Sequence, residues 1–294
     1  MTISFSSFPG LPPGVVLTMV FIFGLLIGSF LNVCIRRLPA EQPEERSIVH
    51  PRSHCPHCKA PIDWYDNIPL LSYLLLAGKC RSCKMPISAL YPVVELITAL
   101  LFLASAAVFG LTFIALKWTI FACLMIVLVF TDIIARILPD PITFGGLAAG
   151  LVLAFFSVPE DGAAAWLSRR LFDFPPPAPV LSLADTLFGA ALGGGLLWLV
   201  GEVYFKMRGR EGMGFGDVKM MTLVGAFLGP QRTFLTILVG SLLGSILGLL
   251  FILVRRKGAD YELPFGSFLG IAALLVVFFG TPVLEWYLRI SGIR

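Results

Sequence analysis

TFLTILVGSLLGSILGLLFILV, residues 233–254, decides the class of fold because it contains no charged residue. A helix needs about 20 apolar residues to cross the roughly 30 Å hydrocarbon core of a bilayer, and this run is long enough. Its glycines at 240, 244 and 248 recur at every fourth position. Small residues at such intervals let helix backbones approach closely in lipid. The stretch therefore predicts a packed membrane-spanning helix.

The rest of the chain is also strongly apolar. It is 57% hydrophobic and 14% charged, with a mean hydropathy of +0.89, whereas a soluble domain is about 25% charged. We expect an all-α polytopic membrane protein with about eight transmembrane helices and a small zinc-ribbon-like loop domain in the cytoplasm. The expected spans are 14–35, 89–109, 113–131, 141–157, 181–203, 217–230, 233–254 and 264–288. A count of seven is the alternative, because the sixth run is short.

Basic residues predict the orientation, since cytoplasmic loops carry an excess of Lys and Arg. Most of the 22 Lys and Arg residues lie in four segments that we assign to the cytoplasm: 36–88, 133–140, 204–216 and 255–263. The N-terminus is then outside, and 158–180 is an irregular outer loop. No basic segment precedes the first span, so we expect a retained anchor and not a cleaved signal peptide. The net charge of +4 marks the cytoplasmic face and indicates no nucleic-acid partner.

The first cytoplasmic loop carries two CxxC pairs, Cys55 with Cys58 and Cys80 with Cys83. Four thiolates in this pattern predict a closed, structural tetrahedral Zn²⁺ site. Disulfides are the alternative, but the reducing cytoplasm disfavours them. His54 and His57 flank the first pair and are alternative ligands, although we expect them to be solvated. Cys34 and Cys123 lie in apolar spans and are expected to be small core residues.

Two carboxylates stand out, because charges inside spans are costly and are usually functional. The predicted topology places Asp132 and Asp217 at the cytoplasmic ends of their spans. Two carboxylates that approach each other share a proton, so that one acts as base and the other as acid, and such a pair can activate water against a peptide carbonyl. Asp140 precedes Pro141, and this order favours a helix N-cap.

Glycines precede the second of these acids in GMGFGDVKMM, residues 212–221. Gly214 and Gly216 leave the backbone bare where an extended substrate could lie, and they permit non-helical dihedral angles just before Asp217. A simple helix-entry turn with an acid at its N-terminus is the alternative. The partner carboxylate Asp132 favours the functional interpretation.

Taken together, these motifs resemble those of the bifunctional prepilin peptidases, also called type IV leader peptidases and N-methyltransferases, which are GxGD-type intramembrane aspartic proteases. The resemblance covers most of the chain. It rests on the paired CxxC motifs and, in the family's order, on GSFLNVCIRRLP (28–39), WYDNIPLLSYLLLAGKCRSC (64–83), ISALYPVVELIT (87–98), DIIARILPD (132–140) and GMGFGDVKMMTLVGAFLG (212–229).

The resemblance implies that Asp132 and Asp217 are the catalytic pair. The substrates would be type IV prepilins or type II secretion pseudopilins, cleaved after a glycine on the cytoplasmic side of their hydrophobic segment. The new N-terminal residue would then be methylated from S-adenosylmethionine. The enzyme would lie in the bacterial inner membrane, with an anchor (1–35), a zinc-binding loop domain (36–88) and a peptidase domain (89–294).

The methyltransferase site is poorly marked, since no Rossmann-type glycine fingerprint is present. Arg36, Arg37, Tyr91 and Glu95 are candidates for binding the methyl donor because they lie at the membrane edges of the zinc loop. Glu95 could pair with a substrate amine, or it could be an acid near a helix N-terminus. The two arginines could equally be membrane anchors. Leu90 stands where the family often has Arg, a departure that concerns the methyltransferase half alone.

Two alternatives compete with this hypothesis. A proton-coupled transporter would also hold intramembrane aspartates, but near the membrane midplane and with repeated halves. This chain has no convincing internal repeat, and its acids lie near one face. A monofunctional preflagellin-type peptidase would lack the zinc loop. The sequence does not predict the oligomeric state.

Overall fold

The computed structural model describes residues 12–156, 162–171, 176–210, 212–255 and 264–291, and within these ranges every regular element is a helix. The chain divides into two compact units, Met1–Val127 and Leu128–Arg294. The boundary falls within a helix, α4 (Phe113–Ala135). An all-α fold is therefore confirmed.

In the first unit, α1 (Pro13–Arg37) packs against α3 (Leu90–Phe109). Two glycines of α1 make this approach possible. A β-carbon at Gly24 would lie 2.6 Å from the Cα of Ala99, and one at Gly28 would lie 2.7 Å from the Cα of Glu95. Since real β-carbons do not come this close to a backbone, the crossing requires glycine at both positions.

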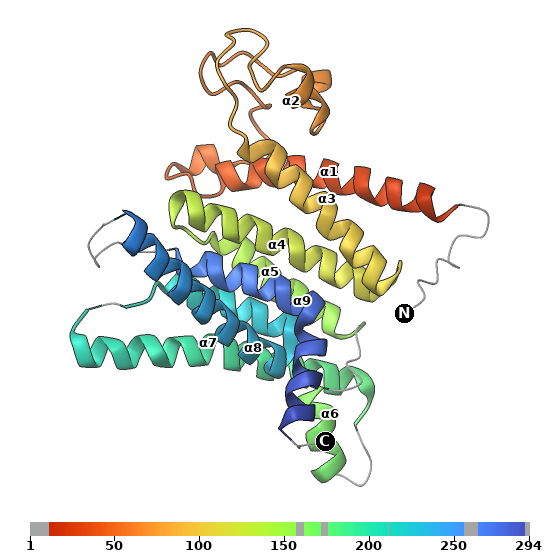
Figure 1. The fold of residues 1–294 in the computed structure, drawn as a ribbon, viewed down its shortest axis with the longest axis vertical. Helices are drawn as coiled ribbons and strands as arrows, with labels where there is room; N and C mark the ends of the chain where they lie inside the picture. The colour runs from red at the N-terminus through yellow and green to blue at the C-terminus, as the bar shows by residue number, and fades with distance from the viewer. Residues whose placement is uncertain (1–11, 157–161, 172–175, 211, 256–263, 292–294) are drawn as a thin grey trace. The chain divides into compact units, whose positions relative to one another are not determined.

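The loop between these two helices, orange in Figure 1, extends away from them and holds three short helical elements. These are η1 (Pro43–Arg46), η2 (Trp64–Asn67) and α2 (Leu71–Leu75). The two CxxC motifs lie on either side of η2 and α2. Arg37, at the end of α1, fastens the loop to the membrane helix by donating hydrogen bonds to the carbonyls of Ser47 and Pro51 at 2.7 and 2.6 Å.

The second unit contains α5 (Asp140–Ala154), α6 (Ala163–Leu171), α7 (Ala178–Arg208), α8 (Phe215–Arg255) and α9 (Phe265–Ile290). Helix α8 contacts α5, α7 and α9 (Figure 1). The α7–α8 contact is built on glycine: a β-carbon at Gly189 would overlap the carbonyl of Gly225, and one at Gly193 would overlap that of Met221. Gly189 and Gly193 of α7 thus form a packing surface for α8.

Helix α8 reverses its direction at Gly229. This residue has φ 72° and ψ 173° and precedes Pro230, a combination that ends a helix and favours glycine. A β-carbon at Gly193 would contact both the Met221 carbonyl and the Thr233 methyl group, whereas a straight helix would separate these two residues by about 18 Å. The element therefore consists of an N-terminal arm (215–228) and a C-terminal arm (231–255) that fold back on one another.

Six helices of the described residues are long and apolar enough to span a membrane, namely α1, α3, α4, α7, α8 and α9. The predicted count of eight is not confirmed. Helix α5 has 15 residues and extends over about 22 Å, less than the roughly 30 Å core. The predicted spans 217–230 and 233–254 are the two arms of α8.

The predicted irregular loop 158–180 is wrong in part, because α6 and the start of α7 (Ala178) lie in it; residues 158–161 and 172–175 lie outside the described residues. The buried carboxylate of Asp185 in α7 accepts a hydrogen bond from the Ala164 N–H at 2.8 Å. This bond satisfies an N–H of the first turn of α6 that has no partner within the helix. Sequence periodicity could not reveal this contact between helices.

Candidate active site and cysteine cluster

Asp132 and Asp217 both belong to the second unit and face a common point. Asp132 lies near the end of α4 and Asp217 in the first turn of α8, and the two residues are 6% and 9% exposed. A β-carbon at Gly266 would lie 2.7 Å from Oδ1 of Asp217 and 3.2 Å from Oδ2 of Asp132. Because both distances start from the same point, the separation of these two oxygens cannot exceed the sum of the two distances. The fold brings the predicted pair together, and the catalytic role of the pair stays a prediction.

The surroundings of the two carboxylates differ. Ser267, in the first turn of α9, donates hydrogen bonds from its N–H and from its hydroxyl to Oδ2 of Asp132, both at 2.6 Å. A helix N-terminus and two donors stabilise an ionised carboxylate. The Asp217 carboxylate has no hydrogen-bond or ion-pair partner among the described residues. The geometry therefore favours a negative charge on Asp132 and the shared proton on Asp217.

Sequence reasoning missed Gly266 and Ser267. A β-carbon at 266 would lie 2.7 Å from one carboxylate oxygen and 3.2 Å from the other, so a side chain there would force the two acids to move. A signal was available in the sequence. Pro264, Gly266 and Ser267 lie at the start of the last predicted span, which was assigned to the same membrane face as the two acids. Neither position carries a charge, so a search for ionisable groups passed over both.

The two glycines before Asp217 differ in their position relative to α8 and in their surroundings. Gly216 lies inside α8, where a β-carbon would be 3.2 Å from the Leu138 side chain, so the expected non-helical dihedral angles are wrong at this position. Gly214 precedes the helix, and its carbonyl accepts the Asp217 N–H at 3.1 Å. A β-carbon at Gly214 would meet only Oδ2 of Asp217, at 3.9 Å. The backbone at Gly214 is thus open beside the acid, while the substrate role of both glycines stays a prediction.

The predicted N-cap role of Asp140 is wrong. The cap position is Pro139, Asp140 is the first helical residue of α5, and its side chain makes no capping hydrogen bond. The carboxylate instead forms an ion pair with Lys219 of α8. The Lys219 ammonium also lies over the rings of Phe144 and Phe215, 5.7 and 5.6 Å from their centroids. This contact between helices explains how a charged lysine is held two positions after Asp217.

The four cysteines of the loop form one cluster in which all sulfur atoms lie within 4.8 Å of one another. The Sγ atoms of Cys55 and Cys83 are 3.8 Å apart, and those of Cys58 and Cys80 are 4.0 Å apart. Four sulfurs in a tetrahedron at the usual Zn–S distance are about 3.8 Å from one another, whereas a disulfide needs about 2.05 Å. The residues thus fit the expected zinc ion. The Nδ1 atom of His54 instead lies 3.1 Å from the Arg52 carbonyl.

The two CxxC motifs share one backbone conformation. In the first, the Cys55 N–H bonds to the Ala60 carbonyl and the Lys59 N–H to the Cys55 carbonyl, both at 2.9 Å. In the second, Cys80 bonds to Met85 at 2.9 Å, and Lys84 bonds to Cys80 at 3.0 Å. Hydrogen bonds from the Cys58 and His57 backbone N–H groups lower the pKa of the Cys55 thiol, which favours the thiolate that a metal requires.

An ion pair links the second CxxC motif to η2. Arg81 donates two hydrogen bonds of 2.6 Å to the Asp66 carboxylate, which is the bidentate arrangement. The Arg81 guanidinium lowers the pKa of Asp66. The cysteine cluster and η2 are therefore fixed relative to one another.

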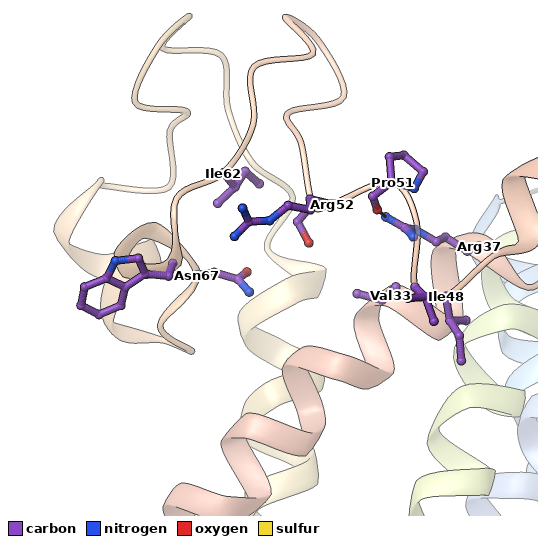
Figure 2. A pocket seen from close by; sticks show the side chains of 10 residues that line it. Val33, Arg37, Ile48, Pro51, Arg52, Ile62 and Asn67 are labelled. Atoms are coloured by element: carbon purple, nitrogen blue, oxygen red, sulfur yellow. Dashed lines mark hydrogen bonds between the residues drawn. The ribbon is translucent and has the colours of Figure 1, made fainter.

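The four residues predicted to bind the methyl donor differ in what they contact. Arg36 donates to the Tyr91 hydroxyl at 2.6 Å, and Glu95 accepts the Leu70 N–H at 2.9 Å. Glu95 is buried, with 7% of its surface exposed, and so supports the loop and not an open site. Arg37 alone of the four lines a cavity, which is drawn in Figure 2. The ligand-binding role of all four stays a prediction.

The fold and the site define a class of protein: a multi-pass helical membrane protein with two buried carboxylates that face one another. Comparison with known proteins narrows this class. Residues 22–109 match the bacterial peptidase A24 N-terminal domain, and residues 119–249 match the type IV leader peptidase family.

Relatives that match over most of the chain support the same family. The prepilin leader peptidase/N-methyltransferase of Aeromonas hydrophila is 36% identical over 94% of this chain and 95% of its own length. The proteins of that name in Pseudomonas aeruginosa and Legionella pneumophila are 36% and 35% identical over 93% and 92% of this chain, and over 93% of their own lengths. No solved structure matches the chain. The chain belongs to the type IV leader peptidase family.

The predicted family is thus confirmed, and with it the predicted class of enzyme, a membrane peptidase with methyltransferase activity. The comparisons give no support to a proton-coupled transporter. The match of residues 22–109 to a bacterial N-terminal domain includes the cysteine loop, which the monofunctional alternative would lack.

Proposed function

We propose that this enzyme cleaves the leader peptides of type IV prepilins or type II secretion pseudopilins and then N-methylates the new N-terminal residue. The names of its relatives support this substrate and both reactions. One observation supports the proposed peptidase activity most directly. Asp132 and Asp217 face one point beside Gly266, and among the described residues hydrogen-bond donors hold Asp132 but not Asp217.

The asymmetry assigns a role to each acid. Asp132, stabilised as the anion by Ser267 and by the N-terminus of α9, takes a proton from the attacking water. Asp217 carries the proton and gives it to the carbonyl oxygen of the scissile peptide as the tetrahedral intermediate forms. When the intermediate collapses, the proton held by Asp132 passes to the leaving amine, and Asp217 regains its proton from the carbonyl oxygen. The C–N bond is broken, and water is consumed.

The substrate backbone would approach along Gly214, where no side chain intervenes before Asp217. Gly216 contributes by closing against Leu138, which helps to fix the first turn of α8. An extended strand is required at this point because a helical peptide presents no free carbonyl to the water.

The methyltransferase reaction uses S-adenosylmethionine as the methyl donor. The free α-amino group of the cleaved pilin accepts the electrophilic methyl group and loses a proton. Zinc held by Cys55, Cys58, Cys80 and Cys83 would be structural, because four protein ligands leave no open coordination position. Its binding would stabilise a loop too small for a core of its own.

We further propose the bacterial inner membrane as the location, with the N-terminus outside and the loop 36–88 and both aspartates at the cytoplasmic face. The three-part division into anchor (1–35), zinc loop (36–88) and peptidase (89–294) belongs to the same proposal. The excess of basic residues in the assigned cytoplasmic segments supports it.

Substitution of the two acids tests the peptidase mechanism. Asp132→Asn and Asp217→Asn preserve size but can neither take up nor release the shared proton. Each should abolish cleavage of a prepilin peptide by the detergent-purified enzyme, and the double variant should be no worse than the singles, because members of one catalytic unit fail together. Methylation of a pre-cleaved pilin with labelled methyl donor should survive all three changes and serves as the control for folding.

Substantial cleavage by Asp217→Asn would overturn the aspartic mechanism. Loss of methylation in a variant that still binds zinc would mean that the two reactions share a site.

A further inference from the structure

Two cavities among the described residues differ in chemistry. One, of about 500 Å³, lies between α7 and α8 and is lined by apolar and small residues such as Ala190, Gly194 and Phe215. The other, of about 280 Å³, lies in the first unit between the end of α1 and the cysteine loop (Figure 2). Only the second offers ionic and amide groups to a ligand, since both Arg37 and Arg52 line it together with Asn67.

The Arg52 guanidinium is available to an anion. No hydrogen bond or ion pair to it is found among the described residues, in contrast to Arg37, Arg46 and Arg81, whose guanidiniums are all engaged. In Figure 2 the Arg52 side chain extends between Ile62 and Asn67. A guanidinium with free donors in a cavity suits a carboxylate, which it can bind in a bidentate manner.

An aromatic surface lies in the same cavity. Trp64 lines it and is 76% exposed, so most of the surface of this residue is open to a ligand. Indole faces stack on planar bases and attract cations more strongly than other aromatic rings do. The apolar side chains of Val33, Ile48, Val49 and Ile62 complete the lining.

The cavity is held rigid from two sides. Arg37 joins the end of α1 to Ser47 and Pro51 of the loop. The Ser53 carbonyl accepts the Ile62 N–H at 2.9 Å, which fastens the opposite wall to the first CxxC motif. This wall of the cavity and the first CxxC motif are therefore joined by backbone hydrogen bonds.

We propose that this cavity binds S-adenosylmethionine, with its carboxylate on Arg52 and its adenine or sulfonium group against Trp64. The inference rests on the proposed methyltransferase activity and names the site for its donor. The donor carries a carboxylate, an ammonium and a sulfonium group, which the apolar cavity between α7 and α8 could accept only at high cost. Arg36, Tyr91 and Glu95 then act in holding the loop, and Arg37 frames the site.

Binding measurements on the full-length, zinc-loaded enzyme in detergent test the site without relying on methyl transfer. We expect calorimetry to show that Arg52→Gln and Trp64→Ala each raise the Kd for S-adenosylmethionine about tenfold or more. Trp64→Phe, which keeps an aromatic face, should retain most of the affinity. Lys79→Gln, which removes an exposed charge of the same loop outside the cavity, is the matched control and should bind normally.

A second ligand distinguishes the loss of the direct Arg52 contact from a general distortion of the loop. Decarboxylated S-adenosylmethionine lacks the group assigned to Arg52, so Arg52→Gln should bind it as well as the unaltered enzyme does. A variant that merely distorted the loop would lose both ligands equally, and that result would contradict the Arg52 contact.

Unchanged affinity in both Arg52→Gln and Trp64→Ala would overturn the site while leaving the proposed methyltransferase activity intact. Absence of donor binding and of methylation in the unaltered enzyme would overturn the activity as well. Peptide cleavage by every variant shows that the comparison concerns folded protein.

Discussion

At the scale of single residues, the reactivity of the site depends on what surrounds two chemically identical acids. Asp132 receives two short hydrogen bonds from Ser267, whereas Asp217 is buried without a hydrogen-bond or ion-pair partner among the described residues. A difference of this kind lets two carboxylates divide the roles of base and acid. Gly266 allows their approach by having no side chain between them.

Ser267→Ala tests whether that difference matters. The change removes the hydroxyl donor but keeps the N–H, and a hydrogen bond to a charged group contributes about 1.5–3 kcal/mol. We expect kcat for prepilin peptide cleavage to fall about tenfold or more with little change in KM, since this hydroxyl bonds to the catalytic carboxylate. Ser267→Thr keeps the donor and should restore most of the rate. Equal activity of the Ala and Thr variants would contradict the positioning role.

At the scale of elements, the membrane helices of the second unit are held together by backbone contact at glycine. Gly225 of α8 meets the backbone of Gly189 so closely that a β-carbon there would overlap its carbonyl. Gly225→Ala should therefore destabilise the protein by about 1–3 kcal/mol through overpacking. Gly195→Ala, six residues after Gly189 in α7 and in open space, is the control and should be neutral or slightly stabilising, because Ala favours a helix over Gly. Thermal unfolding in detergent measures both; similar losses would refute the packing argument.

The cysteine loop is the other element whose stability can be tested. Cys80→Ser removes one of four sulfur ligands, and structural zinc contributes directly to folding. Metal analysis should find less than one zinc per chain, and limited proteolysis should cut residues 36–88 faster than in the unaltered protein. Cys34→Ser changes a buried thiol outside the cluster and should keep the metal. Full zinc occupancy in a Cys55→Ser, Cys80→Ser double variant would refute this ligand set.

At the scale of the whole molecule, the distribution of charge predicts which side of the membrane each segment faces. A membrane-impermeant maleimide applied to intact cells should label Glu160→Cys and leave Lys59→Cys unlabelled until the cells are opened. This follows because the basic residues concentrate in the segments assigned to the cytoplasm. Labelling of Lys59→Cys from outside would reverse the topology and would move the proposed active site to the other face.

Much of this protein was predictable from the sequence. Apolar runs report helices and their lengths, since each residue contributes its hydropathy whatever its neighbours are. The spacing within CxxC pairs is local and predicted the four-cysteine cluster, and the charge pattern put Asp132 and Asp217 on one face. The motifs predicted the family, which the comparisons confirm.

Only the tertiary structure decided which distant groups meet. Ser267 lies 135 positions from the carboxylate that it holds, and Lys219 lies 79 positions from Asp140. No periodicity encodes such pairs, because helix packing brings them together through contacts that neither segment specifies alone. The reversal at Gly229 likewise turned two predicted spans into the arms of one broken helix. Hydropathy fixes where a helix can lie in lipid, whereas close contact at glycine and hydrogen bonds between helices fix what each helix faces.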